Sequence, residues 1–366
     1  MIKRLFLLSF FLFPLLGAAQ YEFSGEVRLN CLPVQDQGRT GTCWSFSTAS
    51  FLESELLRMG QPAVNLSEMY GVRLVYMDKA ENYLLRQGKA QFSQGGLGHD
   101  LLRAVALGGI VPEATYPGKG EESGRHDHRQ LETDLRNLLD GYIDSGAPPA
   151  NWRKEIQEVL DTYFGPAPDS FRLNGQAYSP ELLAQRMGLN PADYVSFTSY
   201  THHPFYEPFV LEIPDNYSNG MFWNVPMEEL EQIVDAALKK GYTVVWDGDV
   251  SERGFSAAQG LAILPQDEAR KDRFKKPGPE VAVTQQLRQQ TFERYATTDD
   301  HLMHLVGTAE DQLANRYYLI KNSWGDRTSF EGYLYMSLPY FRLKTVSILL
   351  HKDAVPSSLA KKCGWE

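Results

Sequence analysis

Cys43 lies in the part of the sequence that is richest in residues able to do chemistry. It follows Gln37 and two glycines and directly precedes Trp44. Apolar residues at 46, 49, 52 and 56 recur every three to four positions, which predicts a helix that begins at the cysteine and ends before Gly60. A thiol at a helix N-terminus favours the thiolate. The Gln37 carboxamide and the Cys43 backbone N–H could together form an oxyanion hole.

The pattern Gln-Gly-x-x-Gly-x-Cys-Trp-x-Phe that surrounds Cys43 resembles the active-site segment of the papain-like cysteine peptidases. Thr40 stands where papain has a disulfide-forming cysteine, a difference that leaves the catalytic atoms untouched. Residues 322–325 read Asn-Ser-Trp-Gly and are similar to the block that carries the family's third catalytic residue. The resemblance implies that Asn322 orients a histidine base and that Trp324 shields their hydrogen bond from water.

Two histidines compete for the role of base on a strand expected over 299–307. His301 fits the family pattern, because Asp300 precedes it and Gly307 stands six places after it. His304 is three residues further along and would face the opposite side of the strand, so we take His301 as the base. The resemblance also places Leu302, where the family usually has alanine or glycine, beside the substrate pocket.

Further elements follow the order found in the family. Ser67 is expected to cap a helix that runs to about residue 83. Gly95 and Gly96 resemble the family's glycine pair, whose backbone binds the substrate as an added strand.

The spacing of the motifs indicates a large insertion. Cys43 and His301 are 301 − 43 = 258 residues apart, whereas about 130 to 150 residues separate the corresponding positions in papain-like enzymes. A long insertion without room for a propeptide resembles the bleomycin hydrolase and aminopeptidase C branch. The insertion predicts helices over 131–142, 152–163 and 180–187, with Gly188 as the stop of the third, and an irregular segment over 189–225. A further helix is expected over 227–238, and residues 239–250 resemble that branch's strand leading into the second lobe.

The resemblance implies an α+β fold with a helical left lobe and a right lobe built on an antiparallel sheet. We expect a signal peptide over 1–19, the left lobe over 20–118, a mainly helical insertion over 119–225 and the right lobe over 226–366. The signal peptide is predicted because Lys3 and Arg4 precede an apolar stretch at 5–16 and a small-residue cleavage site at 17–19. The mature chain would then be periplasmic or extracellular, with no membrane span.

The composition excludes several classes of partner. The chain of 366 residues has a formal net charge of −10 and no long basic block, which argues against nucleic acid. It has no phosphate loop or dinucleotide motif, and we expect no cofactor. The histidines at 126, 128, 202 and 203 lack the ligand spacing of a zinc site and are expected on the surface, so no metal is predicted.

An odd number of cysteines in an exported chain leaves at least one thiol free. We expect that thiol to be Cys43, with Cys31 and Cys363 joined in a disulfide. Only fifteen residues follow the expected last strand, 345–351, and a disulfide would hold this tail away from the cleft. In the bleomycin hydrolase and aminopeptidase C branch, a C-terminal arm closes the cleft and binds the substrate's amino terminus.

The expected function is hydrolysis of peptide bonds by Cys43, His301 and Asn322, with Gln37 in the oxyanion hole. The branch resemblance favours an aminopeptidase, while the short tail weighs against the branch's usual means of restricting the cleft. An endopeptidase, a catalytically silent peptide-binding protein and an acyl transferase stay open as alternatives. The partner is a peptide or protein substrate, and the sequence leaves a homo-oligomer open.

Overall fold

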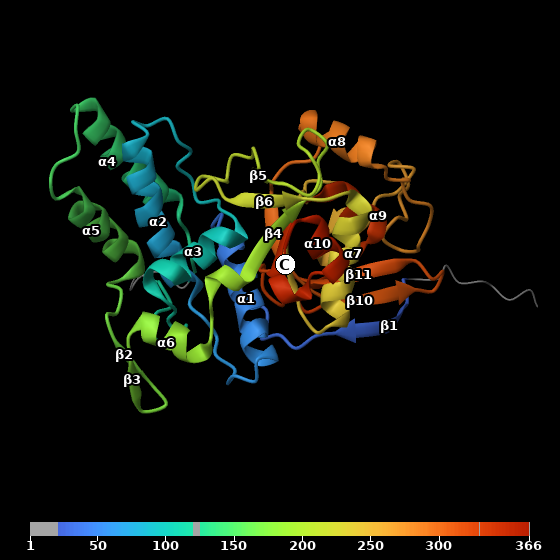
Figure 1. The fold of residues 1–366 in the computed structure, drawn as a ribbon, viewed down its shortest axis with the longest axis horizontal. Coiled ribbons are helices and arrows are strands. Elements are labelled where there is room, and N and C mark those ends of the chain that lie inside the picture. The colour runs from blue at the N-terminus through green and yellow to red at the C-terminus, as the bar shows by residue number, and fades with distance from the viewer. Residues whose placement is uncertain (1–20, 120–124, 329, 366) are drawn as a thin grey trace, which may run out of the picture.

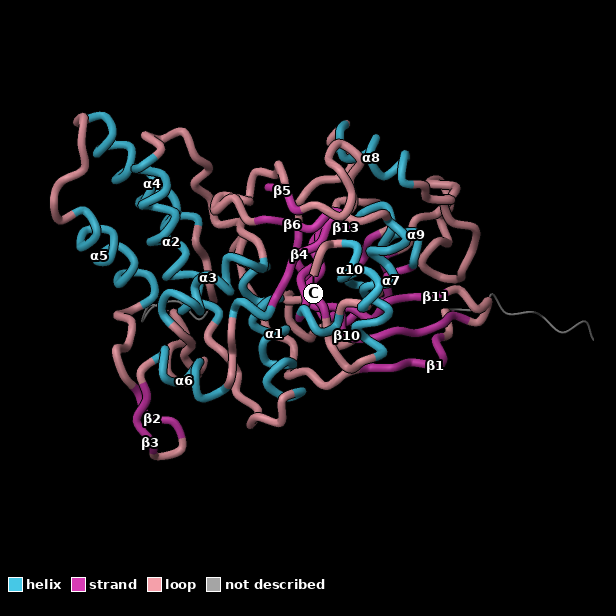
Figure 2. Tube along the Cα trace, viewed as in Figure 1, coloured by secondary structure: helices cyan, strands magenta, loops and turns pink. Residues whose placement is uncertain are grey.

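The computed structural model describes residues 21–119, 125–328 and 330–365. Helices gather in one half of the molecule and a large sheet with its covering helices forms the other half (Figure 1; Figure 2). Within the described ranges no helix is both long enough and apolar enough to cross a membrane. The expected signal peptide, residues 1–19, lies outside the described residues.

Helices α1 to α6 form the helical half (Figure 1). Helix α1 packs against α2 and α3, α2 packs against α4 and α5, and α6 packs against α3. Most of these helices follow the periodicities expected from the sequence. Their bounds are α1 Cys43–Arg58, α2 Glu68–Leu85, α3 Gly98–Gly108, α4 Arg129–Asp144, α5 Trp152–Phe164 and α6 Pro180–Met187.

Helix ends lie where the sequence predicts them. Ser67 caps α2, because its side chain accepts a hydrogen bond from the backbone N–H of Tyr70 at 3.1 Å. Ser179 caps α6 in the same way, and Gly188 ends that helix in the left-handed conformation with φ of 77°. These caps are local, which is why sequence reasoning finds them.

A large, mostly antiparallel sheet forms the other half. Its strand order is β5-β6-β4-β13-β7-β10-β11-β12-β9-β8, with β1 added to β10, and only the pairs β4–β6 and β9–β12 are parallel among the described strands. The strands are β1 Phe23–Arg28, β4 Tyr194–Thr198, β5 Pro208–Val210, β6 Met221–Asn224, β7 Val244–Gly248, β8 Phe255–Ser256, β9 Leu261–Ala262, β10 His301–Asp311, β11 Arg316–Lys321, β12 Tyr333–Ser337 and β13 Thr345–His351. A separate hairpin joins β2 Phe171–Leu173 and β3 Gln176–Tyr178.

The segment 189–225 differs from the expectation of an irregular chain. It contributes β4, β5 and β6, and β4 pairs with the last strand, β13, over five residue pairs. Each of these strands has three to five residues, too few for a clear alternating pattern in the sequence. Long-range pairing to β13, rather than local propensity, therefore determines their structure.

Two hydrophobic cores lie on opposite faces of the sheet. Leu302 of β10 and Leu349 of β13 belong to the core that contains α1. Met303 and Ile348, each one residue away, belong to the core formed with α7 Met227–Lys239 and α9 Leu338–Lys344. The alternation along each strand decides which side chains pack against α1 and which pack against α7 and α9.

The C-terminal segment packs on the sheet face opposite α1. After β13 it forms helix α10, Ser357–Lys362, and Trp365 places its ring 5.4 Å from the ring of Trp223 and 5.9 Å from that of Phe197. Phe197 and α10 share the core formed with α7. Residues 352–365 therefore lie on the far side of the sheet from Cys43.

The expected disulfide is wrong, because Cys31, Cys43 and Cys363 are all free. Cys363 is buried in the core formed with α7, whereas Cys31 packs with a small cluster near β12 and its sulfur lies 3.3 Å from the Tyr333 hydroxyl. Parity of the cysteine count gave no information on this separation. Packing of α10, rather than a disulfide, holds the tail in place.

Candidate functional site

Cys43 is the first residue of α1 and lines a cleft between the two halves, with 8% of its surface exposed. Two hydrogen bonds fix the facing segment 94–96: the backbone N–H of Gly41 donates to Gln94 Oε1 and Trp44 Nε1 donates to the Gln94 carbonyl, both at 2.9 Å. A Cβ built on Gly96 would lie 3.1 Å from the Trp44 ring. Glycine therefore allows this backbone to approach the start of α1 closely.

His301 begins β10 and is joined to the turn that follows β11. Its Nε2 lies 2.8 Å from Asn322 Oδ1, and the Trp324 ring stacks on the imidazole with a centroid distance of 4.6 Å. The histidine is 3% exposed while Trp324 is 43% exposed, so the indole covers the hydrogen bond from solvent. The structure thus brings together three residues that the sequence placed in two separate strands.

His304 occupies a different environment. Its Nδ1 lies 2.9 Å from the hydroxyl of Ser50 on α1, and the Lys321 ammonium donates to the same hydroxyl at 2.7 Å. His304 is fully buried, and burial followed by the nearby Lys321 charge lowers its pKa well below the usual value. These contacts make His304 part of the packing between α1 and the sheet.

Gln37 joins the segment before α1 to the turn that carries Asn322. Its backbone N–H donates to the Ser323 carbonyl at 2.9 Å, and its Oε1 accepts a hydrogen bond from the Ser323 hydroxyl at 2.6 Å. Its Nε2 donates to the Thr40 carbonyl at 2.7 Å, which uses one of its two hydrogens. Gln37 also lines the cleft with Cys43, so a second N–H is available at the place expected for an oxyanion hole.

Burial disfavours charge on the thiol and on the imidazole when each is considered alone. It raises the pKa of Cys43 to about 12, and it lowers the pKa of His301 to about 4 against the opposing effect of the Asn322 hydrogen bond. The same loss of water strengthens attraction between opposite charges, and the N-terminus of α1 favours a negative sulfur. Proton transfer from sulfur to imidazole therefore depends on the two groups acting as a pair.

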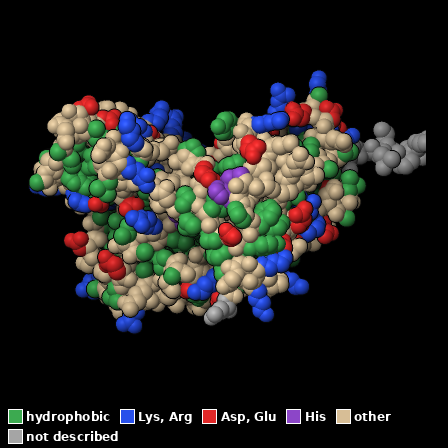
Figure 3. Space-filling view, turned by 45° about the horizontal axis from the view of Figure 1, so that its top comes forward, with side chains coloured by type: hydrophobic (Ala, Val, Ile, Leu, Met, Phe, Trp, Pro, Cys, Tyr) green, Lys and Arg blue, Asp and Glu red, His purple; other side chains and the backbone are tan. Residues whose placement is uncertain are grey.

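The cleft has a volume of about 600 Å³, and the surface dips between the two halves of the molecule (Figure 3). The helical half contributes residues 37–41, Cys43 and 93–96 to its walls. The sheet half contributes Asp299, Asp300, Leu302 and Trp324. All the residues expected near the substrate, Gly95 and Gly96 included, therefore line one cleft.

Sequence reasoning missed two carboxylates that line the same cleft, Glu132 and Asp215. Glu132 lies in the first turn of α4, where it accepts a hydrogen bond from Gln94 Nε2 at 3.0 Å. Asp215 lies in the segment that was expected to be irregular. No motif or period marks either residue, because each reaches the cleft only through long-range packing.

A pair of acidic residues lies at the sheet side of the cleft. The carboxyl groups of Asp247 and Asp299 share a hydrogen bond, which requires a proton on one of them. Burial raises the pKa of Asp247 to about 7, and burial together with Asp247 raises the pKa of Asp299 well above its usual value. Of the two, only Asp299 lines the cleft. Asp247 lies on β7 and pairs with Leu302 on the neighbouring strand β10.

The prediction of surface histidines is wrong for His126 and His128. They are 7% and 3% exposed, and burial lowers their pKa values to about 4 and about 3. Arg39 donates its backbone N–H to the His126 carbonyl at 2.8 Å, which packs this segment against the turn before α1. The residues around them in the sequence are polar, so the sequence did not indicate that these histidines are buried.

His202 and His203 lie nearer the surface, in the segment between β4 and β5. Their Nε2 atoms lie 3.2 Å and 2.7 Å from the two carboxylate oxygens of Glu212. One ligand atom from each of the three residues lies within 4.8 Å of the others, an arrangement that could hold a metal ion and that the sequence spacing did not predict. The same hydrogen bonds to Glu212 also account for the group without an ion.

Comparisons with known proteins identify the family and the fold. Residues 154–365 match the family described as Peptidase C1-like family, and residues 24–167 match the papain family cysteine proteases. Aminopeptidase W of Lactobacillus delbrueckii subsp. lactis is 25% identical over 91% of this chain and 84% of its own length, and human bleomycin hydrolase is 22% identical over 93% and 85%. The solved structure of PepW from "lactobacillus rhamnosis" superposes with a TM-score of 0.73 at 18% identity, covering 95% of this chain and 85% of that one. The predicted branch and the predicted papain-like α+β fold are confirmed.

Proposed function

We propose that Cys43, His301 and Asn322 form the catalytic triad of this chain, which belongs to the Peptidase C1-like family and is a cysteine-type peptidase. One observation carries this assignment. His301 Nε2 lies 2.8 Å from Asn322 Oδ1 under the Trp324 ring, beside the cleft that the Cys43 side chain enters. The other ring nitrogen of His301 is thereby left to exchange a proton with the thiol.

The proposed reaction has two stages. Cys43 gives its proton to His301 and its sulfur attacks the peptide carbonyl, forming a tetrahedral intermediate. His301 then returns the proton to the leaving amine, and the acyl group remains on sulfur as a thioester. Water, deprotonated by His301, hydrolyses the thioester, and the thiol and neutral imidazole are restored.

Gln37 and the Cys43 backbone N–H are the proposed donors to the oxyanion. Gln37 is 6% exposed and is held by hydrogen bonds to Thr40 and Ser323, so its carboxamide needs no reorganisation when charge develops. Cys43 is the first residue of α1, where backbone N–H groups lack intrahelical partners.

Aminopeptidase activity is the proposed specificity. The names of the relatives, aminopeptidases W, G and C among them, support it. The test is a pair of fluorogenic peptides that differ only in whether the amino terminus is free or acetylated. Cleavage of the free peptide alone is the expected result, and equal cleavage of both would favour the endopeptidase alternative.

The catalytically silent alternative makes a different prediction. Stoichiometric labelling of Cys43 by an epoxide inhibitor, with loss of labelling in Cys43→Ala, would support a working nucleophile. Mass spectrometry of the products separates hydrolysis from acyl transfer to an amine. Absence of both labelling and product would leave the silent, peptide-binding protein as the better account.

Export is also part of the proposal. The basic residues Lys3 and Arg4, the apolar stretch at 5–16 and the small residues at 17–19 support a cleaved signal peptide. N-terminal sequencing of the protein recovered from its native compartment tests it. A first residue at Gln20 is expected, whereas a retained Met1 would contradict export by this route.

A further inference from the structure

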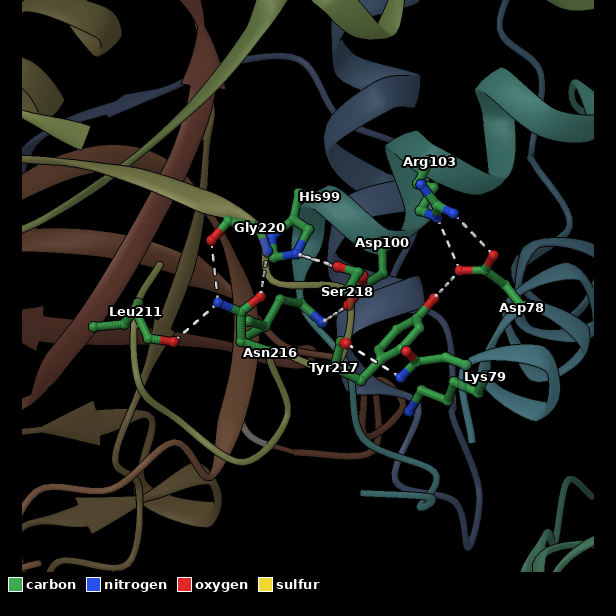
Figure 4. Close-up of polar contacts among 12 residues, drawn as sticks. Asp78, Lys79, His99, Asp100, Arg103, Leu211, Asn216, Tyr217, Ser218 and Gly220 are labelled. Carbon is green, nitrogen blue, oxygen red and sulfur yellow. Dashed lines mark hydrogen bonds and ion pairs between the residues drawn. The ribbon is translucent and has the colours of Figure 1, made fainter. Parts of the chain in front are cut away.

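Residues 211–220, called here the 211–220 loop, form a closed turn between the two halves of the molecule. Asn216 closes it from inside: its Nδ2 donates to the carbonyls of Leu211 and Gly220 at 2.9 and 3.1 Å, and its Oδ1 accepts from the Gly220 N–H at 2.7 Å (Figure 4). Asn216 is 6% exposed. The loop therefore has a defined shape that does not depend on a bound ligand.

Two side chains fasten the 211–220 loop to the helical half (Figure 4). The Tyr217 hydroxyl donates to Asp78 Oδ2 at 2.9 Å, and the Ser218 hydroxyl donates to Asp100 Oδ1 at 2.7 Å. Asp78 belongs to α2 and Asp100 to α3. A segment that follows β5 of the sheet is thus fixed across the interface to the helical half.

Asp215 brings its carboxylate to the glycine pair in the cleft. A Cβ built on Gly95 would lie 1.8 Å from Asp215 Oδ2, so the carboxylate occupies the space directly over the Gly95 backbone. Gln91 Nε2 donates to Asp215 Oδ1 at 2.9 Å and holds the group in place. Asp215 also lines the same cleft as Cys43. The 211–220 loop therefore brings a carboxylate into the cleft at the segment expected to bind substrate backbone.

Lys79 is a buried cation that interacts with Asp215, and it shares its charge with other carboxylates. Lys79 is 2% exposed, and its ammonium donates to the Ser93 carbonyl at 2.9 Å and to the Gly95 carbonyl. Lys79 interacts electrostatically with Asp100, Asp215 and Glu132, so one positive charge serves three carboxylates. Asp100 is fully buried and accepts hydrogen bonds from the Leu97 N–H and the Ser218 hydroxyl.

Acidic residues outnumber basic ones in the cleft lining. The lining includes four acidic residues and one basic residue, Arg39, the acidic ones being Glu132, Asp215, Asp299 and Asp300. Behind Asp299 lies Asp247, which is 1% exposed, and Asp247 Oδ1 and Asp299 Oδ2 receive no hydrogen bond from any other described donor. Mutual repulsion among Asp215, Asp247 and Asp299 raises the pKa of Asp299 further. A cation that enters this end of the cleft would relieve that repulsion.

We propose that Asp215 binds the free α-ammonium group of the substrate and that the 211–220 loop closes this end of the cleft. This inference rests on the proposed aminopeptidase function. A peptide whose backbone runs along Gly95 and Gly96 places its amino end at the Asp215 carboxylate, and a longer peptide meets the loop. Residues 352–365 lie on the other face of the sheet, so the loop performs the restriction independently of that segment.

The experiment compares Asp215→Asn with the control variant Glu132→Gln. Glu132 is another carboxylate that lines the cleft, but it already pairs with Gln94 and, at 3.6 Å, with Arg136. The substrates are a fluorogenic peptide with a free amino terminus, its acetylated form and a des-amino analogue. Asp215→Asn should lower kcat/KM for the free peptide roughly 10- to 100-fold, the usual worth of a charge-assisted hydrogen bond. Cleavage of the acetylated and des-amino forms should be unchanged or faster.

The control and the pH profile separate the alternatives. Glu132→Gln should keep the wild-type preference for the free peptide. In the wild type, kcat/KM for the free peptide should fall as the substrate amine loses its proton near pH 8, and that decline should be absent with the des-amino analogue and in Asp215→Asn. The wild-type profile needs no variant, so it tests recognition of the substrate ammonium group even if Asp215→Asn folds poorly.

Each outcome has one meaning. Equal cleavage of free and acetylated peptides by the wild type would overturn the proposed aminopeptidase function itself. A strong wild-type preference that Asp215→Asn retains would overturn only the role of Asp215. A proportional loss of kcat/KM on all three substrates, with a lower melting temperature, would show that Asp215 is a structural counter-ion of Lys79. An equal change in Glu132→Gln would show a general effect of the negative charge in the cleft. Either result would refute the inference.

Discussion

Removal of the hydrogen bond between Asn322 and His301 should slow peptide hydrolysis without abolishing it. In Asn322→Ala the imidazole loses the acceptor that lies 2.8 Å from its Nε2. His301 carries a positive charge during the reaction, and hydrogen bonds to charged groups contribute about 1.5 to 3 kcal/mol. That range corresponds to about a 10- to 150-fold loss in kcat/KM.

The structure places the expected loss toward the middle of this range. The Trp324 ring still stacks on the imidazole at 4.6 Å and keeps part of its orientation. The Ser323 backbone N–H, which donates to Asn322 Oδ1 at 2.7 Å, also loses its acceptor, and the turn could shift. We therefore expect a loss of roughly 30-fold, measured by steady-state kinetics with the free peptide, and nearly unchanged KM.

Asn322→Asp is the matched variant. It keeps an acceptor for His301 and adds a negative charge, which should raise the pKa of the imidazole and move the pH–rate profile toward higher pH. Asn322 Nδ2 is buried without a described partner, so the amide hydrogens themselves stabilise little. An Asn322→Ala enzyme within threefold of wild type, or an Asn322→Asp enzyme no faster than Asn322→Ala, would refute the orienting role.

Three further results are expected. Alkylation of Cys43 at pH 7 should slow at least ~100-fold in His301→Gln and recover only in alkali, because burial, together with nearby carboxylates, raises the pKa of the thiol to about 12. An unchanged rate would contradict the coupling of the two groups. The His304→Asn variant, if folded by circular dichroism, should retain most of the activity, and loss of activity in a folded variant would reassign the base. The wild type should lose stability as pH rises from about 4 to 7, because a carboxyl with a folded pKa near 7 stabilises the native state only while it stays protonated, and Asp247→Asn should remove this loss. The pH profiles of the two proteins in chemical unfolding should diverge by roughly 4 kcal/mol over this range, and parallel profiles would exclude the raised pKa.

The parts of the structure that the sequence predicts are those that depend on neighbouring residues. Helix α1 begins at Cys43 and ends at Arg58, as its apolar spacing and Gly60 indicate. The positions of His301 and Asn322 follow from a motif in which both the strand and the turn are encoded locally. Their meeting at 2.8 Å follows because β10 and β11 are adjacent antiparallel strands, a common arrangement for consecutive strands.

Other features depend on contacts between distant segments, and the sequence does not predict them. Residues 189–225 were expected to be irregular because they are rich in proline and aromatic residues, but they form the short strands β4 to β6, and β4 pairs with β13 far along the chain. The burial of His126 and His128 and the separation of Cys31 from Cys363 belong to the same class. In each case the local composition was polar or uninformative, and packing decided the outcome.

The proposed role of Asp215 illustrates how such distant contacts would determine specificity. The proposed nucleophile, base and oxyanion donors are held by α1, β10 and the turn after β11, and these elements would serve any peptide that reaches the cleft. On this proposal the substrate preference is set by the 211–220 loop, which Tyr217 and Ser218 hold in place. A loop can change its sequence without disturbing the catalytic elements, because its anchoring contacts lie on α2 and α3 rather than on the strands. Restriction of the cleft can therefore arise from the insertion while the chemistry of the two lobes stays the same.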